Sequence, residues 1–355
     1  MYQINDKVTT KLLRWYIENQ RVLPWRGQKD PYKIWLSEII MQQTRVVQGT
    51  PYYLKIVDRF PEIATLAEAE EQEVLKFWQG LGYYSRARNM HHTAKTVVSK
   101  YNGVFPSEYK DILKLKGIGP YTAAAIASIA FNKPYAALDG NVYRVLSRLF
   151  GITMPVNENG AANIFQKLAD ELLDRKEPGQ FNEAIMEFGA TLCLPKNPLC
   201  EMCPVIMHCE AKKQGIENTL PIKIALKAVK SRYFHYLLIK HDTHLYLKER
   251  EAGDIWQGLF DLPLIEKENS LLLDEKDVRN FLNNEEVILK PLKKINHKLT
   301  HQRLEITFYE AHINMESSLL NGKSILVDLE SLKQYPLPKP IELFLNDYLC
   351  NPKIW

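Results

Sequence analysis

The chain has 355 residues, of which 46% are hydrophobic and 25% charged, so it is globular and long enough for two or three domains. No apolar run approaches the roughly 20 residues that a membrane span needs, and the N-terminus lacks the basic-then-apolar order of a signal peptide. We therefore expect a cytoplasmic protein that makes no membrane contact and has no disulfides. The net charge is +4, and residues 1–225 hold 28 Lys and Arg against 23 Asp and Glu, so the positive excess lies in this part.

Helical spacing dominates the first part of the chain. Residues 1–211 place apolar side chains three and four apart, as in Val8, Leu12 and Tyr16, which predicts helices almost throughout. From residue 231 the period changes to two, most clearly at 304–309, which predicts strands. The basic segment 212–230 contains Pro221 and is interpreted as a linker rather than core. The sequence thus predicts a helical domain at 1–211, a linker, and a smaller mixed α/β domain at 231–350.

An early helix carries a glutamate among apolar neighbours. Asp30 and Pro31 mark the start of the helix, and Ile34, Trp35 and Met41 then share a face with Glu38. Removal from water would raise the pKa of that carboxyl, as a general acid near neutral pH requires. The alternative is a surface glutamate on an irregularly patterned helix.

A short glycine turn precedes the next distinctive helix. Gly117 and Gly119 are followed by Pro120 at a helix start and by an alanine-rich run. Backbone N–H groups at such a helix N-terminus can bind a phosphate without contacting a base, as in a helix-hairpin-helix. A simple turn between two helices is the alternative.

Asp139 lies in Leu138-Asp139-Gly140-Asn141-Val142, directly before a predicted helix. Aspartate is a favoured N-cap residue, and this structural role can coexist with a catalytic one.

Four of the five cysteines form a cluster with the spacing Cys-x6-Cys-x2-Cys-x5-Cys, namely Cys193, Cys200, Cys203 and Cys209. Four thiolates can bind a tetrahedral zinc ion or a [4Fe-4S] cluster. The unequal short gaps favour the cluster, and four unligated thiols would have no reason to gather in this way. Cys350 lies far away and has no assigned role.

Several segments together resemble the adenine DNA glycosylase (MutY) family of the endonuclease III superfamily. They occur in family order over about residues 20–210 and are Leu23-Pro24-Trp25-Arg26, Ser37-Glu38 through Thr44, Trp78 to Asn89, Leu138 to Val142 and the four cysteines. The resemblance implies a monofunctional glycosylase that excises adenine mispaired with 8-oxoguanine or guanine in base excision repair. It also implies a bacterial, nucleoid-associated protein that acts as a monomer on double-stranded DNA.

The resemblance further assigns the chemistry to particular residues. Glu38 would protonate adenine as general acid, and Asp139 would stabilise the oxocarbenium-like transition state. Tyr121 and Asn141 would line the sugar side. Bifunctional relatives place a lysine, which can form a Schiff base, where this chain has Tyr121, so no strand cleavage is expected.

Other matches concern the DNA. Trp25, Arg26 and Glu183 match the adenine pocket, and Gly117 and Gly119 the phosphate-binding hairpin. Gln43 and the Leu81-Gly82-Tyr83 turn match elements that enter the duplex at 8-oxoguanine, although an aromatic in a glycine turn can also serve turn packing. The superfamily fold implies a six-helix module at about 30–137, and a module at about 1–29 plus 138–211 that carries a [4Fe-4S] cluster.

The C-terminal domain resembles the Nudix-like domain that family members use to detect 8-oxoguanine. Residues 256–263 are similar to its Gly-Leu-Trp-Glu-Phe-Pro type of strand, but the acidic Nudix box is absent, so recognition rather than pyrophosphate cleavage is expected. Leu299-Thr300-His301 stands where relatives have Phe-Ser-His. Thr300 and His301 are therefore candidate lesion contacts, and the alternative is a half-buried strand with an incidental threonine.

Two other functions fit part of the sequence. A lyase acting on oxidised pyrimidines would share the hairpin, the aspartate and the cluster, but Tyr121 and the context of Glu38 disfavour it. A non-catalytic iron-sulfur protein that binds DNA and senses redox state would explain the cysteines, but not two carboxylates in matching motifs.

Overall fold

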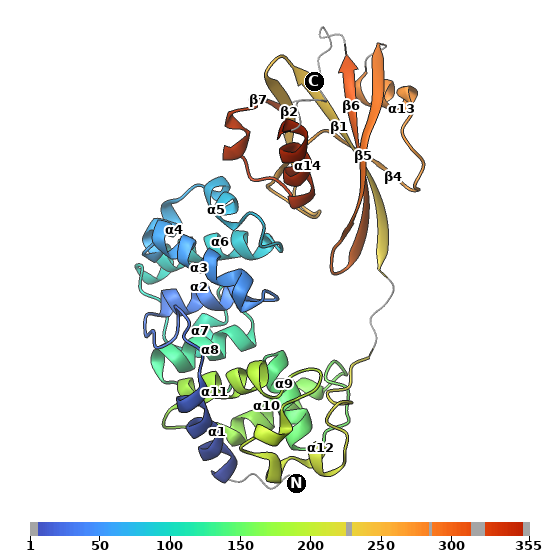
Figure 1. The fold of residues 1–355 in the computed structure, drawn as a ribbon. Coiled ribbons are helices and arrows are strands. Elements are labelled where there is room, and N and C mark those ends of the chain that lie inside the picture. The colour runs from blue at the N-terminus through green and yellow to red at the C-terminus, as the bar shows by residue number, and fades with distance from the viewer. Residues whose placement is uncertain (1–5, 225–228, 284–285, 314–323, 351–355) are drawn as a thin grey trace. The chain divides into compact units, whose positions relative to one another are not determined.

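The computed structural model describes residues 6–224, 229–283, 286–313 and 324–350, and the chain divides into two compact units (Figure 1). The first unit comprises Met1–Glu68 and Asn89–Leu226. The second comprises Ala69–Arg88 and Lys227–Trp355. The grouping of 69–88 with the C-terminal strands is a feature that the sequence pattern did not indicate.

The first unit is helical, as predicted. Its helices are α1 (Asp6–Asn19), α2 (Pro31–Met41), α3 (Val46–Arg59), α4 (Ile63–Glu68), α6 (Ser85–Tyr101, in this unit from Asn89), α7 (Tyr109–Ile112), α8 (Pro120–Phe131), α9 (Gly140–Leu149), α10 (Ala161–Leu172), α11 (Pro178–Thr191) and α12 (Glu210–Lys213), with 3-10 turns η1 (Cys200–Met202) and η2 (Ile206–His208).

Helix α11 packs against three other helices, α1, α8 and α9, and small residues allow two of these close approaches. A Cβ at Gly179 would lie 2.7 Å from the backbone oxygen of Ser128 on α8. A Cβ at Gly189 would lie 2.7 Å from the Cβ of Asn141 on α9. Helix α11 is consequently held close to the C-terminal part of α8 and to the N-terminal end of α9.

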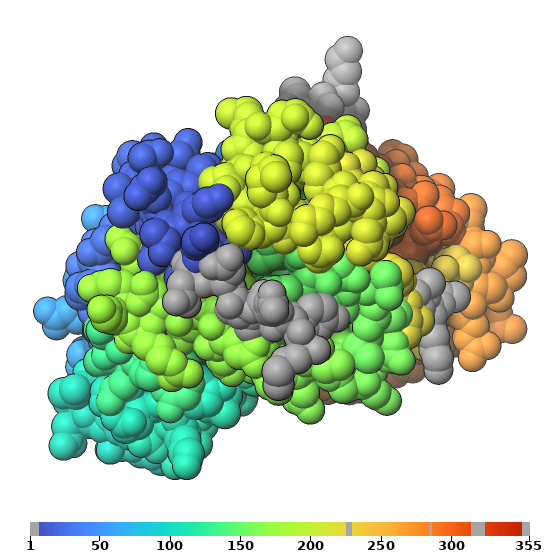
Figure 2. Space-filling model, turned by 90° about the horizontal axis from the view of Figure 1, so that it is seen from below, coloured from blue at the N-terminus to red at the C-terminus, as the bar shows by residue number. Residues whose placement is uncertain are grey.

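The segment predicted as a linker is partly packed onto the first unit. Leu220 is buried, and its backbone oxygen accepts a hydrogen bond from Arg148 Nε at 3.1 Å. The backbone N–H of Val156 donates to the oxygen of Ile222 at 3.0 Å. The interpretation as a linker is therefore wrong up to this point, because an apolar side chain and backbone hydrogen bonds anchor the segment. Figure 2 shows this yellow-green surface on the same face of the unit as the blue surface of α1.

The second unit contains a mixed seven-stranded sheet, which agrees with the predicted α/β domain. The strand order is β3-β2-β1-β6-β5, with β4 paired to β1 and β7 paired to β2, and β1 and β6 are parallel. The elements are α5 (Glu71–Trp78), β1 (Lys230–His241), β2 (His244–Glu249), β3 (Phe260–Asp261), β4 (Leu264–Lys267), α13 (Glu275–Leu282), β5 (Val287–Lys298), β6 (Gln302–Ile313), β7 (Ser324–Asp328), η3 (Ser331–Gln334) and α14 (Lys339–Cys350).

Both faces of this sheet are covered. Phe344 of α14 stacks on Phe308 with ring centroids 3.8 Å apart, and Val278 of α13 lies in a separate cluster with Tyr309. The strand predicted at 304–309 is thus confirmed as part of β6. The alternation of apolar and polar residues does not mark a solvent-exposed face, because Thr307 is buried as well. A central strand is enclosed on both sides by the helices that pack on the sheet.

Polar contacts attach residues 69–88 to the C-terminal strands. Lys76 Nζ donates to the backbone oxygen of Tyr335 at 2.9 Å, and Gln72 Nε2 donates to that of Gly258 at 3.1 Å. Arg88 Nη1 donates to the oxygen of Gln257 at 2.6 Å. Backbone oxygens of the second unit therefore position α5 and the turn that follows it.

Candidate active site

Asp139 is the N-cap of α9, as its sequence context predicted. Its Oδ1 accepts a hydrogen bond from the backbone N–H of Val142 at 2.8 Å, and its Oδ2 accepts one from Asn141 Nδ2 at 2.7 Å. Burial raises the pKa of the carboxyl, whereas these hydrogen bonds oppose the rise. The capping geometry fixes both oxygens, so structural and chemical roles coexist in one side chain.

Glu38 projects from α2, whose start is capped by Asp30 as predicted. Trp35, Ile34 and Ile39 around it are buried, and removal from water raises the pKa of Glu38 to about 7. The buried residues of α2 point to all sides of the helix, so nearly its whole circumference is enclosed rather than one face alone. The carboxyl is half-buried, which rules out the alternative of a surface glutamate.

Tyr121 links the two carboxyl groups. It lies in the first turn of α8 and makes a side-chain hydrogen bond to Glu38, and burial, followed by the negative charges of Glu38 and Asp139, raises its pKa. Its hydroxyl also lies 3.4 Å from Met186 Sδ. A carboxyl oxygen is the stronger acceptor, so we assign the hydroxyl proton to Glu38. Side chains from α2, α8 and α9 thus converge at one place.

The glycine turn before α8 has the expected conformation. Gly117 has φ +82°, where a Cβ would also lie 2.7 Å from the Cβ of Asn89. Gly119 is the N-cap and Pro120 the first residue of the helix. Thr93 Oγ1 donates to the oxygen of Lys116 at 2.9 Å and holds the turn against α6. The N-terminal N–H groups of α8 carry no side-chain cap, which suits an anion.

Arg26 and Glu183, two residues predicted for the adenine pocket, lie together beside this centre. Arg26 Nε is 3.7 Å from Glu183 Oε1, and both charges affect the pKa of Glu38. Burial raises the pKa of Glu183. Both residues also line a polar cavity of about 330 Å³ together with Gln28 and Gln180.

Two further predicted residues occupy the same unit. Trp25 packs edge-on against Tyr53, with ring centroids 5.2 Å apart. Gln43 is exposed and has φ +53°, directly after the end of α2. A non-glycine residue in this conformation is uncommon and occurs at functional sites more often than elsewhere.

The second unit places the two candidate lesion-binding segments next to each other. The hydroxyls of Tyr83 and Thr300 form a hydrogen bond, and both residues line a cavity of about 410 Å³ with His301 and Trp256. Thr300 and His301 form the turn between β5 and β6, so the alternative of a half-buried strand is wrong. Leu81 is buried, whereas Tyr83 is 41% exposed with φ +49°. Of the Leu81-Gly82-Tyr83 turn predicted to enter the duplex, the tyrosine side chain is therefore exposed and the leucine side chain is not.

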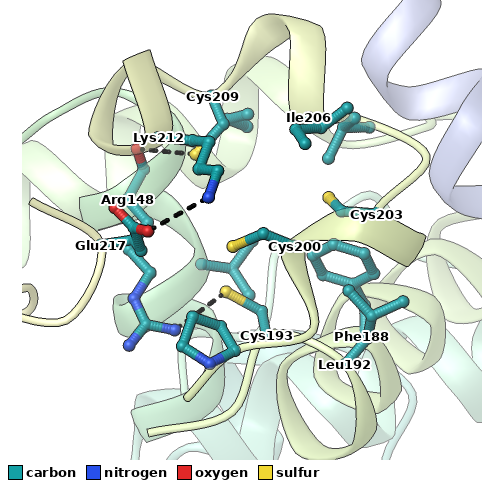
Figure 3. Close-up of a pocket in the computed structure, with 14 residues that line it drawn as sticks. Arg148, Phe188, Leu192, Cys193, Cys200, Cys203, Ile206, Cys209, Lys212 and Glu217 are labelled. Carbon is teal, nitrogen blue, oxygen red and sulfur yellow. Dashed lines mark hydrogen bonds and ion pairs between the residues drawn. The ribbon is translucent and has the colours of Figure 1, made fainter. Parts of the chain in front are cut away.

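The four clustered cysteines line a single cavity at the end of the helical unit (Figure 3). All four are free thiols, and Arg148 Nη1 lies 3.3 Å from Cys193 Sγ. Burial raises the pKa of Cys203 to about 12. Thiols in this state must release protons when they bind a metal. Cys350 ends α14, and its side chain lies outside the described residues.

The donor set at this cavity consists of four cysteine sulfurs. Four thiolates are the ligands that a [4Fe-4S] cluster takes, one on each iron, and a tetrahedral zinc ion takes the same number. The residues present therefore fit the metal group expected from the sequence.

Two arginines without a predicted role, Arg144 and Arg148, connect the cysteine loop to α9. Arg144 Nη2 donates to Asn141 Oδ1 at 2.8 Å, and Arg148 Nη1 donates to the oxygen of Leu194 at 2.6 Å. Both arginines are buried. Their signal in the sequence was two charges four residues apart between apolar positions of a strongly amphipathic helix.

A network of three further residues, none predicted from the sequence, holds Arg26 and Glu183 in place. Its members are Tyr16 on α1, Arg21 just after α1, and Glu187 on α11. Nothing in the local pattern marks these residues, because they come together only through packing of the two helices.

In the part of the chain that the structure describes, no helix has the length and apolar character needed to cross a membrane.

Two family profiles match the chain. The profile of the HhH-GPD superfamily of base excision DNA repair proteins matches residues 36–170, and a NUDIX domain profile matches residues 235–347. Among solved structures, a thermostable thymine-DNA glycosylase is 30% identical with a TM-score of 0.55, over 59% of this chain and 97% of that one. A non-covalent endonuclease III–DNA complex is 19% identical with a TM-score of 0.52, over 60% of this chain and 99% of the other, and supports the fold alone.

The helical fold with its glycine turn is that of a helix-hairpin-helix DNA glycosylase, followed here by a Nudix-like domain. The adenine DNA glycosylase of Buchnera aphidicola subsp. Baizongia pistaciae is 35% identical over 337 residues, which is 93% of either chain. That of Arabidopsis thaliana is 42% identical over 239 residues, or 60% of this chain and 38% of the relative. The chain belongs to the adenine DNA glycosylase family and is an enzyme.

Proposed function

We propose that the chain is a monofunctional glycosylase that excises adenine mispaired with 8-oxoguanine or guanine in double-stranded DNA. The observation that carries this proposal is the convergence of Glu38, Tyr121 and Asp139, with the pKa of Glu38 raised to about 7. About half of the carboxyl groups with this pKa are still protonated at neutral pH and can donate a proton to a leaving base.

Departure of the base leaves positive charge on the sugar. Asp139 is held by two hydrogen bonds, and its anionic form would stabilise this charge, while Glu38 on the other element supplies the proton. The two carboxyl groups differ in environment: Glu38 has few donors, whereas Asp139 has several. This difference supports an acid role for Glu38 and an electrostatic role for Asp139.

The absence of strand cleavage follows from Tyr121. A phenol has no amine nitrogen and cannot form a Schiff base with the sugar, so water completes the reaction. The hydroxyl bonds to Glu38 and would keep that carboxyl in position during proton transfer. The extruded adenine would lie against Arg26, Glu183 and Trp25, at an unstacking cost of a few kcal/mol.

Recognition of 8-oxoguanine is assigned to the second unit. The cavity beside Tyr83, Thr300 and His301 offers a hydroxyl pair and an imidazole, and the domain lacks the paired glutamates of a Nudix box. Gln43 and the turn before α8 would contact the duplex from the first unit, the turn through phosphate.

A [4Fe-4S] cluster bound by Cys193, Cys200, Cys203 and Cys209 would brace the loop at the end of the helical unit. The guanidinium of Arg148, which contacts Cys193 Sγ, would offset part of the negative charge of the thiolates. We propose that the protein acts as a monomer, since the residues assigned to the reaction all come from one chain.

The test is single-turnover excision on duplexes containing 8-oxoguanine:A, G:A and 8-oxoguanine:C, with strand breaks scored before and after alkali. Adenine release from the first two duplexes only, with breaks only after alkali, is the expected result. Glu38→Gln and Asp139→Asn should each slow excision by orders of magnitude. Glu171→Gln, which changes an exposed glutamate on α10, is the matched control.

Normal excision by either active-site variant would refute the assignment of the acid or of the stabilising carboxylate. A DNA adduct that borohydride traps would instead support the lyase alternative, because only a Schiff base is reduced to a stable bond.

A further inference from the structure

Glu187 is a buried carboxylate outside the set of residues that the proposed reaction uses. It lies one turn after Glu183 on α11 and is almost inaccessible, with 2% of its side chain exposed. Burial alone would raise its pKa, but hydrogen bonds and charge from Arg21 and Arg26 hold the pKa below its usual range. The group is therefore a fixed negative charge at neutral pH.

Two arginines share this carboxylate. Arg21 donates from Nε to Oε1 at 2.5 Å and from Nη2 to Oε2 at 2.9 Å, in the bidentate geometry typical of strong pairs. Arg26 Nη2 donates to Oε2 of the same Glu187 at 2.9 Å. The backbone N–H of Arg21 adds a further bond at 3.2 Å. Glu187 thus fixes two guanidinium groups at once.

The remaining contacts of Arg26 direct it toward the active site. Its Nη1 donates to the hydroxyl of Tyr16, which in turn donates to Glu183 Oε2 at 3.2 Å. Arg26 Nε is buried without a hydrogen-bond partner and faces Glu183 at 3.7 Å. Of the two carboxylates beside this guanidinium, Glu187 accepts a hydrogen bond from it and Glu183 lies beyond hydrogen-bond distance. Glu187 is therefore the carboxylate that orients Arg26.

The network is also electrically balanced. Two positive groups, Arg21 and Arg26, oppose two carboxylates, Glu183 and Glu187. Glu38 faces the charged groups Asp139 at the start of α9, Glu183 on α11 and Arg26 from the loop before α2, and the neutral hydroxyl of Tyr121 on α8. A change in the balance of the network thus alters the potential at Glu38 through Arg26 and Glu183.

We infer that Glu187 is a positioning residue that holds Arg26 against Glu183, balances its charge, and thereby sets the electrostatic potential at the general acid Glu38. This inference rests on the proposed function, in which Glu38 is the acid. It assigns a role in the reaction to a residue that touches neither base nor sugar.

The experiment measures the pH profile of single-turnover excision for the full-length enzyme. In Glu187→Gln the two arginines lose a compensating charge, and the potential at Glu38 becomes more positive. This change favours the ionised carboxylate of Glu38. The alkaline limb of the profile, where the excision rate falls as pH rises, should therefore move to lower pH by about half a unit. In Arg21→Gln the network loses a positive charge, and the limb should move to higher pH by a similar amount. The double variant restores the balance and should return the limb close to that of the wild type.

Opposite shifts that cancel in the double variant support the inference. A fall in rate that is equal at every pH, or shifts of the same sign, would overturn it, because a merely structural role predicts those results. If Glu187→Gln does not fold, Glu187→Asp and Arg21→Gln decide, since Asp keeps the charge and should keep the wild-type limb. An alkaline limb that persists in Glu38→Gln would refute the proposed acid instead of this inference.

Discussion

Arg144 Nε donates a hydrogen bond at 2.8 Å to the backbone oxygen of Cys193, the first cysteine of the cluster loop. The same guanidinium donates to Asn141 Oδ1 at 2.8 Å, and Asn141 Nδ2 donates to Asp139 Oδ2 at 2.7 Å. A single arginine therefore joins the loop assigned to the metal and the carboxylate assigned to the sugar. Helix α9 carries Arg144 and Asn141, and Asp139 is its N-cap.

Arg144→Met should lower both stability and excision. The substitution removes the donors to Asn141, to the oxygen of Cys193 and to the oxygen of Gly189, and leaves buried carbonyls unsatisfied. We expect a loss of about 3 kcal/mol in the free energy of unfolding, measured by urea titration. Arg175→Met, at an exposed arginine, should change stability by less than about 0.5 kcal/mol. Equal effects of the two substitutions would contradict the connection.

Glu38→Gln should be more stable than the wild type at alkaline pH. The pKa of Glu38 is raised from 4.5 to about 7 in the folded protein, so ionisation costs the folded state free energy as pH rises through this interval. The cost is absent below pH 4.5 and complete above about pH 7. The variant should gain about 2 kcal/mol relative to the wild type between pH 5 and pH 8, measured by denaturant unfolding. A difference independent of pH would show that Glu38 titrates normally.

Tyr121→Lys should introduce strand cleavage. An amine beside Glu38 and Asp139 can attack the sugar and form a Schiff base, which the phenol cannot do. Borohydride trapping should yield a covalent DNA adduct with the variant and none with the wild type. Tyr121→Phe is the control, because it removes the hydroxyl without adding a nucleophile. No adduct from the lysine variant would place the sugar away from Tyr121.

Thr300→Ala should reduce the preference for 8-oxoguanine:A over G:A. The threonine hydroxyl bonds to Tyr83 at the mouth of a cavity in the second unit, and its loss removes a polar contact for the lesion. We expect a loss of several-fold in the ratio of excision rates on the two duplexes, with the rate on G:A nearly unchanged. Ser331→Ala, in η3, serves as a control substitution of a hydroxyl residue outside that cavity. Parallel losses on both duplexes would assign Thr300 a structural role.

The purified protein should contain iron and sulfide rather than zinc. Four thiols line one cavity, and their unequal, short spacing in the sequence favours a cluster of four irons over a single zinc ion. About four irons per chain and visible absorbance are expected, and Cys203→Ser should lower both together with thermal stability. One zinc ion per chain and no colour would contradict the assignment.

The sequence alone was sufficient for the local features. Asp30 before Pro31, Gly119 before Pro120 and Asp139 before α9 all cap or start helices as expected, because capping depends on residues within one turn. The four cysteines could be assigned to one site from their spacing, since all lie within 17 residues. The change of period near residue 231 likewise separated helices from strands.

Tertiary structure decided the features that depend on contacts between distant segments. Glu187 and Arg21 are 166 positions apart in the sequence, and their pairing exists only because α11 packs against α1. The raised pKa of Glu38 has the same origin, since the desolvation and the charges that set it come from several helices. Burial on both sides of β6 and the burial of Leu81 were also invisible in a periodic pattern. A pattern records which side chains share a face, whereas packing determines what that face meets.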